Sequence, residues 1–359
     1  MRRPVSVSRL LGAIAFSLLA VASTRAASQL ETMDREISAL YERSRDAVVR
    51  IQTQRQAVFP QGPSVRIGTG FFMDHEGHLL TTATVVESAE KCWIDWRGRK
   101  VAARIVGIDP LINLAVLEVN TGEKVPFLKR GNSDELKTGS MLIAIGYPYD
   151  QPSSPMVGFV QGFDIKCGLR TFLTAHVRSD CRLQPGQSGG PVLNPRGEVV
   201  GLAVAAHHES QSYVLPINAA GRAVADILQH GATQYGWVGL SVTERRLTAA
   251  PLASSDWEVF IEEVCSNAPA AAAGFHPQDV LIRIGTNDVR RAADILNTMF
   301  HRRAGDRVCL TVVRAGATQE VALVIGRRPS EETGVATRPS LPSLEPPRLN
   351  LVPVSAPAP

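Results

Sequence analysis

Residues 47–216 contain a long series of short apolar segments separated by turn residues, with little helical periodicity between them. The segments that predict strands are 47–52, 68–73, 79–82, 94–96, 101–105, 114–119, 141–146, 156–162, 171–177, 199–205 and 213–216. Short strands at this spacing are typical of an all-β barrel or sandwich. We therefore expect a mainly β domain, closed by a helix over 219–229 that ends near Gly231.

A second unit with a different pattern runs from about Tyr235 to Gly326. Strands are predicted at 236–242, 259–264, 279–284, 308–314 and 321–325, and helices at 268–274 and 293–300. Pro269 suits the first turn of its helix, where a missing N–H costs nothing, and Gly274 suits the end. This mixture predicts a small α+β domain.

The two ends of the chain have compositions of their own. Residues 1–26 combine an arginine-rich start, an apolar run too short for a stable membrane anchor and small residues before a cleavage point after Ala26, as in a secretory signal peptide. An uncleaved anchor is the alternative. Residues 27–45 predict an amphipathic helix. Residues 328–359 are rich in proline and poor in large apolar residues, so we expect them to be disordered.

Length and charge narrow the function classes. The chain has 359 residues, which favours two main domains, and we place them at 46–232 and 234–327. The net charge of +4 is spread along the chain without a Lys/Arg-rich run, so we expect no nucleic-acid partner. No residue spacing indicates a metal site or a cofactor.

Five cysteines are compatible with an oxidising compartment. Cys167 and Cys181 flank an apparent hairpin and are the best local disulfide pair, and Cys265 with Cys309 is a second possible pair. The odd number leaves at least one free thiol, and an unpaired buried cysteine is the commoner interpretation for each of the five.

The segment Gly186-Gln187-Ser188-Gly189-Gly190-Pro191 is the strongest candidate for chemistry. Flanking glycines allow the sharp, partly positive-φ turn that a nucleophilic serine requires. The N–H groups of Gly186 and Ser188 are then able to point at one place and form an oxyanion hole. The alternative is a glycine turn that connects two strands and has no chemical role.

Several further segments accompany this turn: Gly68-Thr69-Gly70-Phe71, Leu80-Thr81 before Val85-Val86, Asp109-Pro110 before Leu114-Ala115-Val116-Leu117, and Gly146-Tyr147-Pro148. Together they resemble the HtrA/DegP family over residues 45–327. The resemblance implies a trypsin-like double β-barrel followed by a PDZ domain, and a Ser-His-Asp triad that cleaves peptide bonds.

Two of the three triad positions carry other residues in this chain. Thr84 stands where the resemblance places the histidine, and Asn113 stands where it places the aspartate, while Ser188 is retained. A serine hydroxyl needs a base to accept its proton, and a threonine does not act as one near neutral pH. We therefore expect little or no ordinary protease activity. His207, after the strand that follows the serine loop, is the best candidate for a substitute base.

The second domain implies a peptide-binding role. A PDZ domain adds an extended peptide to a sheet edge and holds the peptide's carboxylate with loop N–H groups. The resemblance places that loop at Trp237, Val238, Gly239 and Leu240. The helix 293–300 forms the opposite wall, with Ile295, Leu296 and Met299 as candidate pocket residues. Gln278 replaces a glycine that the family usually has, so the turn there is expected to differ.

These observations favour a secreted or periplasmic bacterial pseudoprotease that binds peptides or misfolded proteins as a chaperone, scaffold or regulator. An active serine endopeptidase that uses Ser188 with a non-standard base is the alternative. The resemblance implies a homo-oligomer, a trimer in the family, or a hetero-assembly with active relatives.

Overall fold

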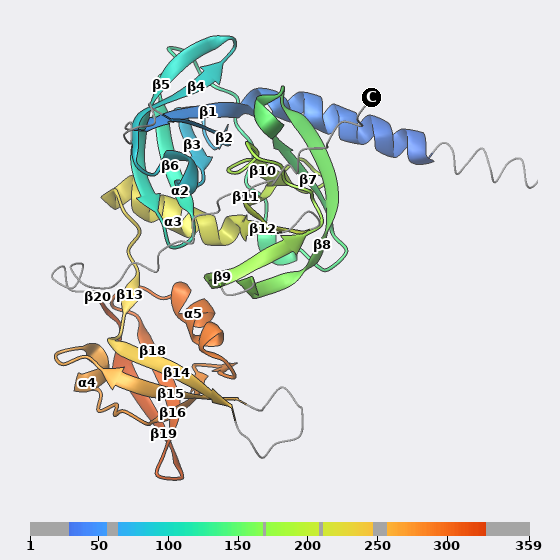
Figure 1. The fold of residues 1–359 in the computed structure, drawn as a ribbon. Coiled ribbons are helices and arrows are strands. Elements are labelled where there is room, and N and C mark those ends of the chain that lie inside the picture. Colours follow the sequence, from blue (N-terminus) through green and yellow to red (C-terminus); the bar gives the residue numbers. More distant parts are fainter. Residues whose placement is uncertain (1–28, 56–63, 168–169, 208–210, 247–256, 328–359) are drawn as a thin grey trace, which may run out of the picture.

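The computed structural model of the protein describes residues 29–55, 64–167, 170–207, 211–246 and 257–327. The predicted signal peptide and the predicted disordered tail lie outside these residues. Two closed β-barrels lie side by side, and a smaller α+β domain follows them (Figure 1). The fold is mainly β, as expected.

The first barrel consists of six antiparallel strands in the order β1-β2-β3-β6-β5-β4. The strands are β1 (Val48–Arg55), β2 (Val65–Phe72), β3 (His78–Thr81), β4 (Ala89–Trp96), β5 (Arg99–Asp109) and β6 (Leu114–Val119). Alternate side chains point inward because successive residues of a strand face opposite sides. Ile51, Phe72 and Leu117 are among those buried in its core. The one-turn helix α2 (Ala83–Val86) follows β3.

The second barrel has the strand order β10-β11-β12-β9-β8-β7. Its strands are β7 (Met141–Gly146), β8 (Ser154–Cys167), β9 (Arg170–Ser179), β10 (Pro191–Leu193), β11 (Val199–His207) and β12 (Gln211–Pro216). Short 3-10 turns occur at η1 (Arg45–Ala47), η2 (Ser133–Glu135) and η3 (Pro148–Asp150). The Ser188 turn lies between β9 and β10 and therefore belongs to this barrel.

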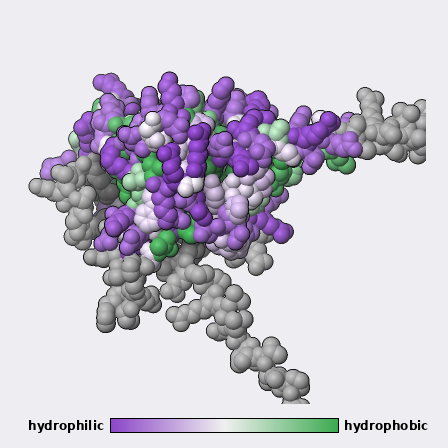
Figure 2. All heavy atoms as spheres, turned by 90° about the horizontal axis from the view of Figure 1, so that it is seen from above, coloured by the Kyte–Doolittle hydropathy of each residue, from purple (hydrophilic) through white to green (hydrophobic). Residues whose placement is uncertain are grey.

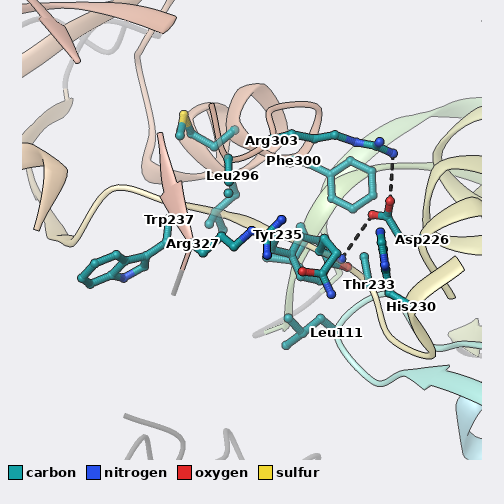
Figure 3. Close-up of a pocket in the computed structure, with 15 residues that line it drawn as sticks. Leu111, Asp226, His230, Thr233, Tyr235, Trp237, Leu296, Phe300, Arg303 and Arg327 are labelled. Carbon is teal, nitrogen blue, oxygen red and sulfur yellow. Dashed lines mark hydrogen bonds and ion pairs between the residues drawn. The ribbon is translucent and has the colours of Figure 1, made fainter. Parts of the chain in front are cut away.

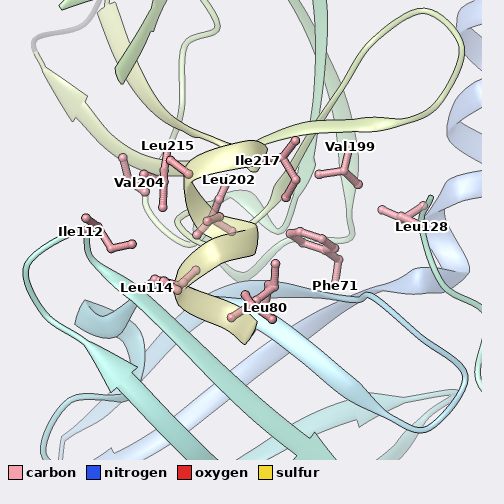
Figure 4. Close-up of a cluster of buried hydrophobic side chains, with 14 of the residues drawn as sticks. Phe71, Leu80, Ile112, Leu114, Leu128, Val199, Leu202, Val204, Leu215 and Ile217 are labelled. Carbon is pink, nitrogen blue, oxygen red and sulfur yellow. The ribbon is translucent and has the colours of Figure 1, made fainter. Parts of the chain in front are cut away.

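Helix α3 (Ile217–His230) joins the two barrels. Its buried side chains, such as Ile217 and Ile227, share a core with Phe71 and Leu114 of the first barrel and Leu202 of the second (Figure 4). Gly231 ends the helix with φ +76°, and its N–H donates to the carbonyl of Ile227. The predicted closing helix is thus confirmed, and it fixes the barrels relative to each other.

The predicted N-terminal helix is present over 29–44, and only its last turns reach the core. Leu40 is 2% exposed and packs into the shared core, whereas Leu30 and Met33 are exposed. The helix projects from the barrels (Figures 1 and 2), and hydrophilic side chains dominate the face that Figure 2 shows. Among the described residues, no helix combines the length and the apolar character needed to cross a bilayer.

The second domain contains a sheet in the order β14-β15-β16-β18-β19, with β17 paired to β16, and a separate pair β13–β20. The strands are β13 (Gly236–Trp237), β14 (Leu240–Arg246), β15 (Trp257–Val264), β16 (Val280–Ile284), β17 (Asn287–Asp288), β18 (Arg307–Arg314), β19 (Ala317–Val324) and β20 (Gly326–Arg327). The helices are α4 (Pro269–Ala272) and α5 (Ala292–Phe300). Because β14 lies at the edge of this sheet, one side of its backbone has no strand partner among the described residues.

The single strand predicted at 236–242 is wrong, because the segment forms two strands in different sheets. Gly239, at φ +75°, breaks the extended backbone between β13 and β14. A Cβ atom at this glycine would lie 2.2 Å from the Cβ of Ala268. The close approach and the positive φ both require glycine.

Neither candidate disulfide forms, since Cys181, Cys265 and Cys309 are free thiols, in agreement with the commoner interpretation of unpaired cysteines. Cys167 pairs with Arg170 at the tip of the β8–β9 hairpin, whereas Cys181 follows the other end of β9. The ten residues of β9 separate the two ends by about 33 Å, too far for a bond that needs Cα atoms within about 7 Å. Two cysteines that flank a strand in the sequence therefore need not face each other in the structure.

Helix α5 docks the second domain on the barrels. Asn297 Oδ1 accepts hydrogen bonds from Thr174 Oγ1 at 3.1 Å and from the N–H of Ala175 at 2.9 Å, both on β9. Phe300 enters the core shared by the barrels. The Tyr235 hydroxyl donates to the buried Asp109 carboxylate at 2.5 Å. The two domains therefore share polar and apolar contacts.

Candidate functional site

The Ser188 turn has the backbone that its glycines predicted. Gly186 and Gly189 have φ values of +95° and +89°. A Cβ atom at Gly186 would lie 2.3 Å from the Tyr147 carbonyl oxygen, and one at Gly189 would lie 2.2 Å from the Thr69 carbonyl oxygen. Both positions therefore exclude larger residues, and the turn holds Ser188 at the seam between the barrels.

Thr69 of the first barrel holds this turn in place. Its hydroxyl donates to the Gly186 carbonyl at 2.7 Å and accepts from the N–H of Tyr147 at 3.1 Å. Its backbone N–H donates to the Ser188 carbonyl at 2.9 Å. Thr69 is fully buried, so water does not reach its polar groups, and these hydrogen bonds satisfy them instead.

The two N–H groups predicted to form the oxyanion hole are available. Within the described residues, neither the Gly186 N–H nor the Ser188 N–H donates to a protein acceptor. The N–H groups on either side are engaged, since Gln187 donates to Gln184 and Gly189 donates to Ala203. Two unengaged N–H groups in one tight turn are suited to a carbonyl oxygen or an oxyanion.

Among the described residues, the side-chain hydrogen-bond partner of the Ser188 hydroxyl is Thr82, which sequence reasoning missed. Thr82 Oγ1 lies 3.0 Å from Ser188 Oγ, and Thr84 Oγ1 donates to Thr82 Oγ1 at 3.3 Å. Thr82 is completely buried. The three hydroxyls form a hydrogen-bonded chain whose members are all alcohols, so none of them acts as a base for the serine.

Asn113 and Thr84, predicted at the other two triad positions, do lie together. Asn113 Oδ1 accepts from the backbone N–H of Thr84 at 2.9 Å, and its Nδ2 donates to the Val204 carbonyl at 3.3 Å. Asn113 has φ +57°, a conformation that asparagine tolerates better than most residues. Its amide therefore orders the loop of Thr84.

None of the histidines described with side chains is a hydrogen-bond partner of Ser188. His176 is buried, stacks on Phe172 with ring centroids 4.0 Å apart, and contacts the Thr174 carbonyl through Nδ1. His207 ends strand β11, and its side chain lies outside the described residues. The expectation that His207 substitutes for the missing base therefore stays untested.

The predicted carboxylate loop of the second domain has unengaged donors. Within the described residues, the N–H groups of Val238 and Gly239 have no acceptor, while their carbonyls accept from Ala270 and Cys265. Leu240 then begins the edge strand β14. This arrangement suits an incoming peptide that pairs with β14 and ends at the loop.

Three of the predicted peptide-binding residues, Trp237, Leu296 and Met299, line a cavity of about 630 Å³ between the domains (Figure 3). The barrels contribute Leu111 and Leu173 to its apolar lining. Asp226, which forms an ion pair with Arg303 at 3.0 Å, lies on its polar side. Val238, Gly239 and Leu240 do not line this cavity. Ile295 packs on the core of the second domain instead.

Gln278, where the resemblance led us to expect a different turn, lies in a positive-φ position that suits glycine. Gln278 has φ +72°, and its N–H donates to the Ile261 carbonyl at 2.8 Å. The left-handed conformation that favours glycine is thus adopted by a glutamine.

One cluster of potential metal ligands occurs in the β2–β3 turn, where Asp74, Glu76 and His78 lie together. Asp74 Oδ1 accepts from the N–H groups of residues 76, 77 and 78, and Asp74 Oδ2 lies 2.6 Å from His78 Nδ1. These bonds explain the cluster as a stabilised turn.

Comparison with known families assigns both domains. The trypsin-like peptidase domain matches residues 68–202, and the PDZ domain matches residues 236–325. The fold and the serine turn thus define a trypsin-like protease fold joined to a PDZ domain.

Proteins of similar sequence are named as serine proteases. A probable periplasmic serine endoprotease DegP-like of Chlamydia trachomatis serovar D is 29% identical over 290 residues, which cover 79% of this chain and 58% of the relative. The putative serine protease HhoB of Synechocystis is 28% identical over 323 residues, covering 79% of this chain and 77% of that protein. The chain thus matches little more than half the length of the DegP-like relative.

Solved structures agree with this assignment. The HtrA-type protease AlgW with tripeptide is 25% identical, has a TM-score of 0.69, and aligns over 82% of this chain and 97% of that chain. A serine endoprotease from Yersinia pestis is 21% identical with a TM-score of 0.62, covering 82% of this chain and 98% of that chain, and supports the fold. Together, the two domains, the DegP-like relatives and the HtrA-type structures support assignment to the HtrA/DegP family.

Proposed function

We propose that this chain is an HtrA-like pseudoprotease that binds peptides or misfolded polypeptides without cleaving them efficiently. One observation carries the proposal: the hydrogen-bond partner of Ser188 Oγ is the hydroxyl of Thr82, at 3.0 Å, where a protease needs an imidazole. The turn and its two unengaged N–H groups are kept, so a peptide carbonyl has donors to bind.

The missing triad residues would contribute a large part of the rate, so we expect cleavage to be inefficient. Removal of a triad member from this kind of site lowers kcat by roughly 10⁴-fold or more, and the oxyanion hole and substrate binding leave a residual activity. Here both the base and its partner are replaced, by Thr84 and Asn113. We therefore expect turnover close to that residual.

We assign peptide capture to the Ser188 turn and to the PDZ domain. The PDZ domain offers the edge strand β14 and the loop N–H groups of Val238 and Gly239. It also contributes Leu296 to the cavity between the domains. AlgW has been solved with a decapeptide and a tripeptide, which supports peptide binding in this family. Peptides that end in an apolar residue are the ligands we propose.

A periplasmic or secreted location fits the proposal. Relatives from Chlamydia, Hahella and Pseudomonas are named periplasmic serine endoproteases. We further propose assembly as a homo-oligomer, with a trimer as the first possibility, or with active relatives. In such an assembly the chain acts as a scaffold, chaperone or regulator.

Labelling with a fluorophosphonate probe tests the pseudoprotease assignment. The probe reacts with activated serines, so we expect wild-type protein and the Ser188→Ala variant to remain equally unlabelled. An active bacterial HtrA protease serves as the positive control. Labelling that is strong in wild type and lost in Ser188→Ala would refute the assignment.

Binding of a fluorescent peptide with an apolar C-terminal residue tests the PDZ assignment. The same peptide with an amidated C-terminus should bind at least about tenfold more weakly, because the loop N–H groups lose a charged acceptor. Gly239→Ala should weaken binding of the free-acid peptide, since its Cβ would displace the loop. Equal affinities for the two peptides would contradict carboxylate capture.

Residual endopeptidase activity is the second candidate function. The feature that favours it is the pair of N–H groups at Gly186 and Ser188, which no described residue engages and which are therefore free to donate to a carbonyl oxygen. Slow, Ser188-dependent hydrolysis of casein at high protein concentration would support this candidate over the first.

A further inference from the structure

A pair of arginines reaches the Ser188 region from strands β1 and β2. Arg55 Nη2 donates to the Thr84 carbonyl oxygen at 3.2 Å, and Arg66 Nη1 donates to the same oxygen. Thr84 is itself linked to Ser188 through Thr82. Two guanidinium groups therefore converge on one neutral acceptor beside the serine turn.

No carboxylate of the described residues pairs with either arginine. Within the described residues, neither Arg55 nor Arg66 forms an ion pair, and the buried Nε of Arg55 has no hydrogen-bond partner. Arg50, in the same strand as Arg55, illustrates the contrast, since it pairs with both Asp95 and Asp150. The sequence between Arg55 and Arg66 contains no Asp or Glu, so this segment supplies no counter-ion.

The charges around Arg66 also favour an added carboxylate. Burial lowers the pKa of the Arg66 guanidinium, the positive charge of Arg55 lowers it further, and Glu87 compensates in part. A carboxylate between the two guanidinium groups would relieve this repulsion and accept the N–H donors that Thr84 leaves unused.

We infer that Arg55 and Arg66 form an anion subsite that binds the carboxylate of an Asp or Glu side chain in a peptide lying across Ser188. The inference rests on the proposed function, because it assumes that a peptide occupies the serine turn. The hydrogen bonds from Thr84 through Thr82 to Ser188 connect the subsite to the serine turn, so one peptide is able to reach both. The subsite makes the bound peptide sequence-selective at a distance from the oxyanion hole.

Paired peptides test the inference. Each peptide is fluorescent, N-acetylated and C-terminally amidated, so that capture of a terminal carboxylate by the PDZ loop does not contribute. One Glu is moved through an apolar sequence, and a Gln peptide matches each position. At about 0.1 M ionic strength, we expect Glu to bind about tenfold more tightly than Gln at one or two adjacent positions, as a charge-assisted contact predicts.

Variants connect the preference to the two arginines. Arg55→Gln combined with Arg66→Gln should abolish the Glu preference and leave the Gln peptides' affinity nearly unchanged. Arg55→Lys with Arg66→Lys should retain part of the preference and reports on folding if the Gln variant is unstable. Arg104→Gln, which removes an exposed arginine of β5 paired with Glu118, is the matched control and should change nothing.

The outcomes separate the inference from the proposed function. Equal binding of Glu and Gln peptides, or a Glu preference that survives in the Arg55→Gln/Arg66→Gln variant, overturns the anion subsite alone. Absence of binding by every amidated peptide overturns peptide capture at Ser188 and the subsite together.

Discussion

Individual side chains decide what the Ser188 turn is able to do. Thr69 fixes the turn from the neighbouring barrel, and Thr82 occupies the hydrogen-bonding position beside the serine hydroxyl. The serine is therefore held in a well-ordered turn, and none of the described side chains bonded to its hydroxyl is a base. The hydrogen bonds that position the turn differ from those that would activate Ser188, so a well-ordered turn does not by itself make the serine reactive.

Thr69→Val tests the structural role of the first of these residues. Valine has a similar shape but loses the hydroxyl, so the Gly186 carbonyl and the Tyr147 N–H each lose a buried partner. We expect the free energy of unfolding to fall by about 2–3 kcal/mol, measured by urea denaturation. Thr318→Val, at an exposed position on β19, should change stability by less than about 0.5 kcal/mol. Equal effects at the two positions would contradict this role.

Gln278→Gly is expected to stabilise the PDZ domain. A residue with a Cβ atom at φ +72° pays about 1–2 kcal/mol for the left-handed conformation, while glycine costs about 0.4–1 kcal/mol in the unfolded chain. The net gain should be up to about 1 kcal/mol, seen as a higher Tm. Asn267→Gly, at φ +63°, should gain less, because asparagine already tolerates this region. A lower Tm for Gln278→Gly would refute the strain.

At the scale of elements, the order of strands and helices was largely predictable, because turn residues and apolar alternation occur together along the chain. The break between β13 and β14 was not, since it depends on Ala268 approaching Gly239 from a distant segment. Thr82 was missed for the same reason: no local signal shows that its hydroxyl faces Ser188. The positions of Thr84, Asn113 and Ser188 were found because their spacing resembles a known family.

The Asp279 carboxylate, directly before strand β16, makes an acid-sensitive contact in the PDZ domain. Burial alone raises the pKa of Asp279, but hydrogen bonds from Arg314 and from the N–H of His276 outweigh it and lower the pKa below its ordinary value. The carboxylate therefore stabilises the fold above its unfolded pKa of about 3.9. This stability is lost as the pH falls through the lower, folded-state pKa.

Asp279→Asn should accordingly make PDZ stability less dependent on pH below about 4 and lower it at neutral pH. Thermal unfolding at a series of pH values measures both effects. Asp288→Asn, whose pair with Arg283 is exposed, is the control and should keep the wild-type acid dependence. An unchanged pH profile for Asp279→Asn would show that other groups cause the acid sensitivity.

At the scale of the whole molecule, the contacts between the domains are built partly from buried polar groups. Tyr235 donates to Asp109, which is 2% exposed, and its ring packs near Phe300 of α5. Burial raises the pKa of Tyr235, and the Asp109 carboxylate raises it further, so the hydroxyl remains a donor. The Asp109-Pro110 segment, noticed in the sequence as a family feature, thus also serves domain docking.

Tyr235→Phe removes this bond and leaves one Asp109 oxygen buried without its partner. We expect a loss of about 1–3 kcal/mol in stability and faster amide hydrogen exchange in α5 and β9, measured by mass spectrometry. Tyr149→Phe, whose exposed hydroxyl bonds to Gln184, should alter neither. Protection of α5 that matches wild type would mean that Asn297 and Phe300 suffice for docking.

The central proposal is that Ser188 sits in a peptide-binding turn that has lost the base and the carboxylate that would orient it. Casein hydrolysis by wild type, Ser188→Ala, and the double variant Thr84→His with Asn113→Asp measures this directly. We predict that wild type and Ser188→Ala are equally inactive, and that the double variant gains hydrolysis which a further Ser188→Ala change abolishes. Ser188-dependent hydrolysis by the wild type at the level of the double variant would contradict the claim.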